Sequence, residues 1–246
     1  MLSNMGNPLV LCIPGPWADR GEFLAAVARH EPPARFLFAG QVLSDTNTQE
    51  RVEVDFQDPD PHLEEAFGIA GQGHLEPSLL SDVARHKSVA YLIFPLDFPM
   101  ERDRIHRFTA LLRDIGGIAV KVESSGIAHS WPQWFELIAG TRLDQYSACV
   151  TLIGGQSYYY SCGMHHFGMP DTAVSRSVRD TEAAYTLNVF NMYLLEEAPK
   201  LEDGHTFSIA QDAPKFRLRH TPDERHPQDD LFHNPNGLWC LDLLAN

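Results

Sequence analysis

The sequence predicts an α/β or α+β protein in which a mixed β-sheet is flanked by helices. Short apolar runs that end at proline or glycine alternate with longer segments whose apolar residues recur at helical spacing. The chain has 246 residues, which is long enough to bury a substantial core, and no repeat of fixed period is visible. We expect a single globular domain over residues 1–246, with a division into two fused lobes near residue 145 as the alternative.

In the first half of the chain, apolar and β-branched runs bounded by turn residues predict strands. These runs are residues 8–14, 35–40, 51–56, 88–96 and 118–123. Apolar residues at helical spacing predict helices over residues 18–30, 62–70, 77–86 and 100–115. Gly116 and Gly117 follow the last of these helices, and glycine commonly ends a helix because it tolerates the left-handed conformation.

The second half of the chain predicts shorter elements. Pro132 stands in the first turn of a helix expected at 131–140, and a longer helix is expected at 180–197. Strands are expected at residues 149–155, 157–164, 207–210, 215–220 and 237–244. The segment 221–236 contains three prolines and many polar residues, which is typical of an ordered surface loop.

The composition excludes several classes of function. The chain has 19 Lys and Arg against 33 Asp and Glu, a formal net charge of −14. This balance argues against nucleic-acid binding and against an anionic membrane surface, since both require clustered cations. No basic residue precedes Arg20, the apolar run 9–13 is too short for a secretory signal, and no apolar window is long enough to span a membrane. We expect a cytoplasmic protein without a cofactor.

The most acidic part of the chain is the segment 50–65. It holds seven acidic residues and one basic residue, Arg51. A solvated surface that aids solubility is the simpler interpretation. The functional interpretation is a negative surface that attracts a basic protein partner and occupies a site built for phosphates. On that interpretation the expected partner-binding residues are Glu53, Asp55, Asp58, Asp60, Glu64 and Glu65.

A second cluster contains Cys162, His165 and His166. Cysteine and imidazole are good zinc ligands, and a cysteine beside a histidine can act as a nucleophile. However, no second ligand pair with zinc spacing is visible, and adjacent histidines in a strand would point to opposite faces. We therefore expect a strand-end turn built around Gly163 and Gly168, with no catalytic residue and no metal ion. A metal-dependent or cysteine hydrolase centred on the three side chains is the alternative.

Three longer strings carry a family resemblance. They are GGIAVKVESSGIAHSWPQWFEL (116–137), YYYSCGMHHFGMPD (158–171) and FSIAQDAPKFRLRHTPDERHPQDDLFHNPNGLW (207–239). Over residues 8–240 the chain resembles the uncharacterised bacterial family of domain of unknown function 4261. The resemblance carries no catalytic residues to transfer, but Gly163, His165, Gly168 and Asp171 look like family signature residues.

The resemblance also implies a class of function. Related proteins are often encoded beside secreted toxins, including type VI secretion effectors, which implies an immunity protein. We accordingly expect a cytoplasmic protein that binds and neutralises a cognate basic toxin, with an effector nuclease as one candidate, by occluding it with the acidic surface. A homodimer through the helix 180–197 and the run Tyr158–Tyr160 is a further option, and core packing is the simpler interpretation of both segments.

Overall fold

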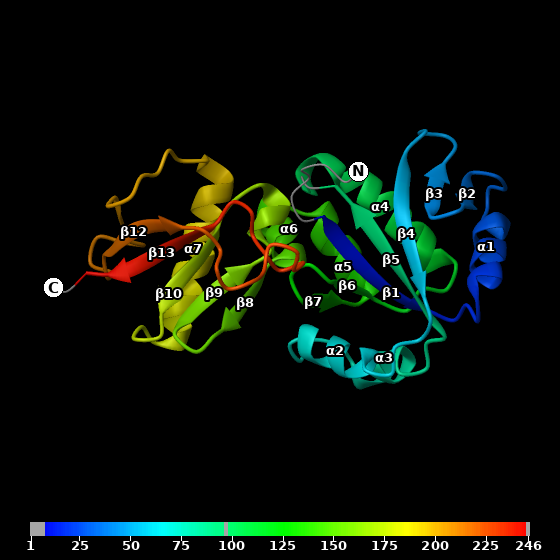
Figure 1. Ribbon diagram of the computed structural model, residues 1–246, viewed down its shortest axis with the longest axis horizontal. Coiled ribbons are helices and arrows are strands. Elements are labelled where there is room, and N and C mark those ends of the chain that lie inside the picture. The colour runs from blue at the N-terminus through cyan, green and yellow to red at the C-terminus, as the bar shows by residue number, and fades with distance from the viewer. Residues whose placement is uncertain (1–7, 96–97, 245–246) are drawn as a thin grey trace.

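Two β-sheets lie side by side along the long axis of the molecule, with helices packed on them (Figure 1). The computed structural model describes residues 8–95 and 98–244. The combination of two sheets and flanking helices confirms the predicted fold class, because helices and strands mix throughout the described chain. The first sheet comes from the first half of the chain and the second sheet from the second half.

The first sheet has seven strands in the order β2-β3-β4-β5-β1-β6-β7, and each neighbouring pair is antiparallel. Its strands are β1 (Leu9–Gly15), β2 (Phe36–Ala39), β3 (Val42–Asp45), β4 (Arg51–Gln57), β5 (Ser88–Phe94), β6 (Val120–Val122) and β7 (Ile127–His129). The central strands β1 and β5 are almost wholly buried, which is why they appear in the sequence as continuous apolar runs. The strand expected at 88–96 ends at Phe94 in the structure, and residue 96 lies outside the described residues.

Helices cover the two faces of the first sheet unequally. One face packs against three helices, α1 (Arg20–Arg29), α4 (Phe98–Asp114) and α5 (Trp131–Ala139). The other face carries the short helices α2 (Leu63–Ala70) and α3 (Pro77–Val83), which pack on Cys12 and Val89. In Figure 1 this short pair lies below the sheet. On the same face of β4, Glu53 is exposed, whereas Asp55 is partly buried opposite Tyr91, which packs against the cluster of these helices.

The second sheet has six strands in the order β11-β12-β13-β10-β9-β8. Its strands are β8 (Thr151–Gly154), β9 (Tyr158–Cys162), β10 (Asp171–Ser175), β11 (Thr206–Phe207), β12 (Phe216–Thr221) and β13 (Leu238–Leu243). The pair β10 and β13 is parallel and the other neighbouring pairs are antiparallel, so the sheet is mixed. Helix α7 (Asp180–Glu197) covers one face of this sheet with buried residues such as Leu187 and Phe190. The homodimer expected through this helix stays a prediction.

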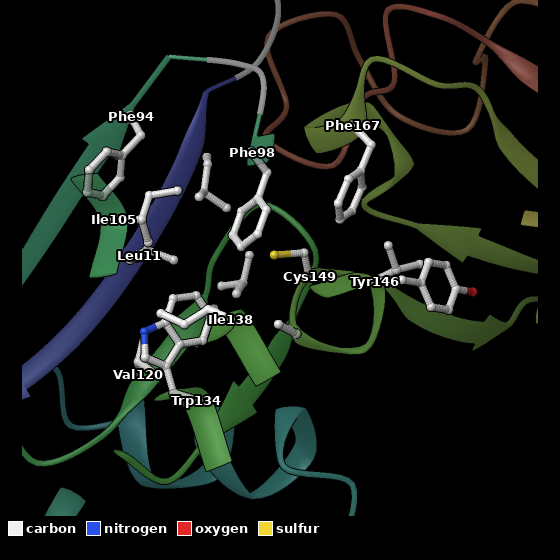
Figure 2. Packing of buried hydrophobic residues seen from close by; sticks show 14 of the residues in the cluster. Leu11, Phe94, Phe98, Ile105, Val120, Trp134, Ile138, Tyr146, Cys149 and Phe167 are labelled. Carbon is white, nitrogen blue, oxygen red and sulfur yellow. The ribbon is translucent and has the colours of Figure 1, made fainter. Parts of the chain in front are cut away.

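The sheets meet around helix α6 (Arg142–Cys149) and the 3₁₀ turn η1 (Met164–Phe167). Phe98 of α4 packs against Phe167 of η1 with ring centroids 5.6 Å apart, and Tyr146 and Cys149 of α6 lie nearby (Figure 2). These residues belong to one hydrophobic cluster that includes side chains from both sheets. The two sheets are therefore joined by a continuous core.

Four elements are present that the sequence analysis does not predict: β3, β7, α6 and β10. Cys149 ends helix α6, so the expectation that it begins a strand is wrong. It is nevertheless fully buried, as is Cys12, which fits their interpretation as small core residues. Within residues 8–95 and 98–244, no helix combines the length and the apolar character that crossing a membrane requires.

Candidate functional site

The acidic segment runs from β4 into α2. Glu53 and Asp55 stand opposite Ile93 and Tyr91 of β5, so all four side chains point to the same face of the first sheet. Asp58 and Asp60 occupy the connection that follows, and Glu64 and Glu65 lie in the first turn of α2, which packs on that face. Asp55 and Asp60 are partly buried and the other four acidic residues are exposed.

None of these six carboxylates forms an ion pair with a described basic residue. Asp55 accepts hydrogen bonds from the Gln57 amide, and Asp60 accepts one from the backbone N–H of His62 at 2.9 Å. The seventh acid of the segment, Glu50, pairs with Arg107, and outside the segment Glu123 pairs with Lys121. The other six carboxylates therefore carry negative charge that no described cation pairs with, and four of them are exposed.

The histidines of the second cluster lie in η1, beyond the strand expected at 157–164, so the alternation of side chains along a strand does not apply to them. The rings of His165 and His166 touch each other, with centroids 4.1 Å apart. Nε2 of His166 lies 2.8 Å from Oγ of Ser124, and neither ring nitrogen of His165 has a hydrogen-bond partner among the described residues. Burial lowers the pKa of His165 to about 4 and also lowers the pKa of His166. Both rings are thus neutral at pH 7.

Cys162 ends β9 and has no hydrogen bond to either imidazole among the described residues. Its sulfur lies 4.0 Å from the carbonyl oxygen of Phe232. Burial, reinforced by the negative charge of Asp171, raises the pKa of the Cys162 thiol far above its usual range. A thiol in this environment is a poor nucleophile and a poor metal ligand because the thiolate is the reactive form. Among the described residues there is no group of three side chains placed to hold a metal ion.

Two glycines shape the turn that carries these histidines. Gly163 precedes η1 with φ of 119°, and Gly168 follows it with φ of 69°. At Gly163 space is also short, since an added Cβ would lie 2.3 Å from the carbonyl oxygen of Cys149. The predicted strand-end turn around the two glycines is therefore observed. It brings the backbone that follows β9 close to the end of α6.

Next to η1 lies a buried polar network that joins β10 to the loop 222–236. Asp171 is fully buried and accepts hydrogen bonds from Ser161 Oγ, from the backbone N–H of Met164 and from Nδ2 of Asn234, the last at 2.9 Å. The guanidinium of Arg225 lies 3.5 Å from the same carboxylate. Arg225 also stacks on the ring of Tyr160, 4.4 Å from its centroid. The network thus ties the long loop to the second sheet.

The pKa values of the two carboxylates beside Arg225 are shifted in opposite directions. Burial raises the pKa of Asp171 to about 6, and Arg225 offsets only part of this effect. Burial also acts to raise the pKa of Asp223, but hydrogen bonds from Arg225 and from the Asn234 backbone outweigh it, so the pKa of Asp223 is held below its ordinary value. Although Asp223 lies in the segment expected to be a surface loop, its side chain is buried and paired with Arg225.

The sequence could have indicated this network only in part. Asp171 stands out as a resemblance residue, whereas Arg225 and Asn234 lie in a proline-rich loop with no local periodicity. Charged residues are rarely buried without a partner, but the identity of the partner depends on the path of the loop. Only the fold reveals that Arg225 and Asn234 of the loop both reach Asp171.

The fold and this network define a two-sheet α/β protein whose long C-terminal loop is fixed by buried charges. The family model described as Domain of unknown function (DUF4261) matches residues 160–231, which include His165, Asp171, Asp223 and Arg225. This match supports the family assignment for that segment, and it leaves the acidic segment outside. No curated protein and no solved structure matches the chain.

Proposed function

We propose that this protein binds a basic protein partner through the acidic segment of β4, the following connection and α2. The observation that carries the proposal is that the six carboxylates lack ion-pair partners among the described residues. Unpaired surface charge of one sign raises the rate at which an oppositely charged partner associates. The net charge of −14 reinforces that attraction at longer range.

The partner that fits this chemistry best is a bacterial toxin, and the protein is then its immunity protein. A nuclease, such as a type VI secretion effector, has a cationic site for phosphates, and a row of carboxylates is complementary to such a site. Binding there would exclude the substrate without any catalytic step. The family resemblance supports this role because related proteins are often encoded beside secreted toxins.

The hydrolase alternative has less support from the geometry. A cysteine nucleophile needs a nearby base and a positive environment, whereas Cys162 contacts a carbonyl oxygen and has a strongly raised pKa. The nearest serine–histidine contact, Ser124 with His166, is fully buried and has no access to a substrate.

The proposal is tested by co-expression of the chain with the toxin encoded by the adjacent gene. We expect rescue of growth, co-purification of a complex, and an association rate that falls steeply with added salt. The charge-reversal variant E53K/D58K/E64K should weaken the complex by about 100-fold. Failure of the wild-type chain to rescue growth or to co-purify would overturn the proposal.

A matched control keeps the change in net charge the same. The variant E196K/E197K/D212K reverses three exposed acids outside the segment, so it should leave affinity nearly unchanged. If both variants weaken binding equally, the attraction depends only on net charge. If neither does, a different surface binds the toxin, and the acidic segment has no role in the complex.

A further inference from the structure

Three exposed apolar side chains lie together on the hairpin of β2 and β3, at one edge of the first sheet (Figure 1). They are Leu37, Ala39 and Val42, and we call them the apolar patch. Leu37 is 52% exposed and Val42 is 39% exposed. Ala39 stands directly opposite Val42, and Leu37 is the diagonal neighbour of Val42 on the same face. None of the three belongs to a hydrophobic cluster formed by the described residues.

Around its turn, over residues 36–39 and 42–43, this hairpin is apolar on both faces. Phe36, Phe38 and Leu43 are buried in the core on the inner face. A strand with one solvated face usually alternates apolar and polar residues, whereas a strand covered on both faces is apolar throughout. The neighbouring strand β4 alternates, with buried Val52 beside exposed Glu53. The hairpin therefore has the pattern of a strand pair that is covered on both faces, although its outer face is open to solvent in the described chain.

The apolar patch is continuous with the acidic segment. Val42 stands directly opposite Glu53 of β4, and side chains in such a pair have Cβ atoms about 4.5–5.5 Å apart. Asp55 follows Glu53 on the same face. Arg51, the only basic residue of β4, also lies on this face, opposite Ser44. One surface thus presents apolar side chains next to an excess of carboxylates.

Charge distinguishes between the possible occupants of this surface. A second copy of the chain, packed face to face, would bring the unpaired carboxylates of two acidic chains together, and such repulsion opposes binding. A basic protein would instead be attracted by the carboxylates. If it also carried apolar side chains, it would cover the patch. Protein interfaces commonly combine a buried apolar centre with a charged rim, and the centre supplies most of the binding free energy.

We propose that the apolar patch is the apolar centre of the interface with a basic protein partner, whose contact surface carries an apolar side chain bordered by Lys or Arg. The inference rests on the proposed function and refines it, because a cationic phosphate site alone would leave the patch uncovered. The two parts of the surface act on different rates. The carboxylates accelerate association, and the apolar patch slows dissociation.

Binding kinetics of the full chain and the toxin encoded by the adjacent gene, measured by surface plasmon resonance, test the inference. The variant L37T/V42T removes apolar surface and keeps residues that suit a strand. We expect it to raise the dissociation rate by about tenfold, with the association rate and its salt dependence nearly unchanged. The variant E53K/D58K/E64K should instead lower the association rate.

The matched control is L143Q/L243T. It changes two leucines that are 52% and 46% exposed and lie outside the first sheet, so both rates should stay as in the wild type. Thermal unfolding checks that each variant is folded. The single variant Val42→Thr, which is close to isosteric, keeps the test decisive if L37T/V42T does not fold.

The outcomes separate this inference from the proposed function. If the wild-type chain forms no complex with the toxin, both are overturned. If E53K/D58K/E64K weakens the complex and L37T/V42T does not, only this inference is overturned. Equal weakening by L143Q/L243T would overturn it too. So would a dimer of the free chain in sedimentation analysis that L37T/V42T dissociates, since the patch would then belong to an interface with a second copy.

Discussion

The guanidinium of Arg225 forms two hydrogen bonds with the carboxylate of Asp223, at 2.8 and 3.0 Å; the Asp223 side chain is fully buried and that of Arg225 is mostly buried. The same guanidinium is the only described cation within 4 Å of the buried carboxylate of Asp171. One arginine therefore compensates two acids that are removed from water. Its loss would leave both without a cation.

Replacement of Arg225 by methionine should be severely destabilising. Removal of one partner from a buried ion pair typically costs about 3–5 kcal/mol, because the remaining charge stays buried. Arg219→Met is the matched control, since Arg219 pairs with Asp242 across an exposed face of the sheet and should contribute only about 0–1 kcal/mol. Urea unfolding measures both free energies. Equal losses in the two variants would contradict a special role for the buried network.

The glycines at the ends of η1 allow a second comparison. Both have positive φ, so replacement by alanine should cost about 1–2 kcal/mol at either position through backbone strain. At Gly168 nothing lies within 4 Å of the added Cβ, whereas at Gly163 the Cys149 carbonyl oxygen is 2.3 Å away. Gly163→Ala should therefore destabilise the protein clearly more than Gly168→Ala in thermal or urea unfolding. A similar loss for both would show that the contact with α6 relaxes freely.

Acid should weaken the fold through His165. Its pKa is about 4 in the folded protein and 6.5 when unfolded, so between these values the unfolded chain binds a proton that the folded chain does not. The stabilisation is complete above pH 6.5 and is lost as the pH falls toward 4, by about 3 kcal/mol for the full shift. Asp171 opposes this loss, because its raised pKa makes the folded state retain a proton as the pH falls from about 6 toward 3.8.

The contribution of His165 is isolated by a variant that removes its imidazole. His165→Phe should flatten the decline in the free energy of unfolding between pH 6.5 and 4, while His62→Phe, which changes an exposed ring, should follow the wild-type profile. Urea unfolding at a series of pH values gives both profiles. A His165→Phe profile parallel to that of the wild type would mean that this imidazole does not couple folding to pH.

The sequence predicts elements well where burial makes the pattern strong. The β1 and β5 runs and the helix that ends before Gly116 are examples, since each packs a long apolar surface into the core. The missed strand β7 has only three residues, which is too short for a clear pattern. For the missed strand β3, the two-residue turn at Gly40 that joins it to β2 was an available signal. Helix α6 begins with a capping box between Thr141 and Asp144, which could have revealed it.

The candidate sites divide in the same way. The acidic segment is visible in the sequence because its charges are consecutive. The Asp171–Arg225 contact joins residues that lie 54 positions apart, and only the tertiary path of the chain brings them together.

Strand β13 follows the segment that the family model matches, yet it lies between β12 and β10 in the second sheet. A polypeptide cut to residues 160–231 would lack that middle strand, and β12 and β10 would each face an empty place in the ladder. It would also lack Asn234, which holds the Asp171 carboxylate. The matched segment is therefore not a unit that would fold by itself, and truncated forms of this protein should keep the chain through Leu243.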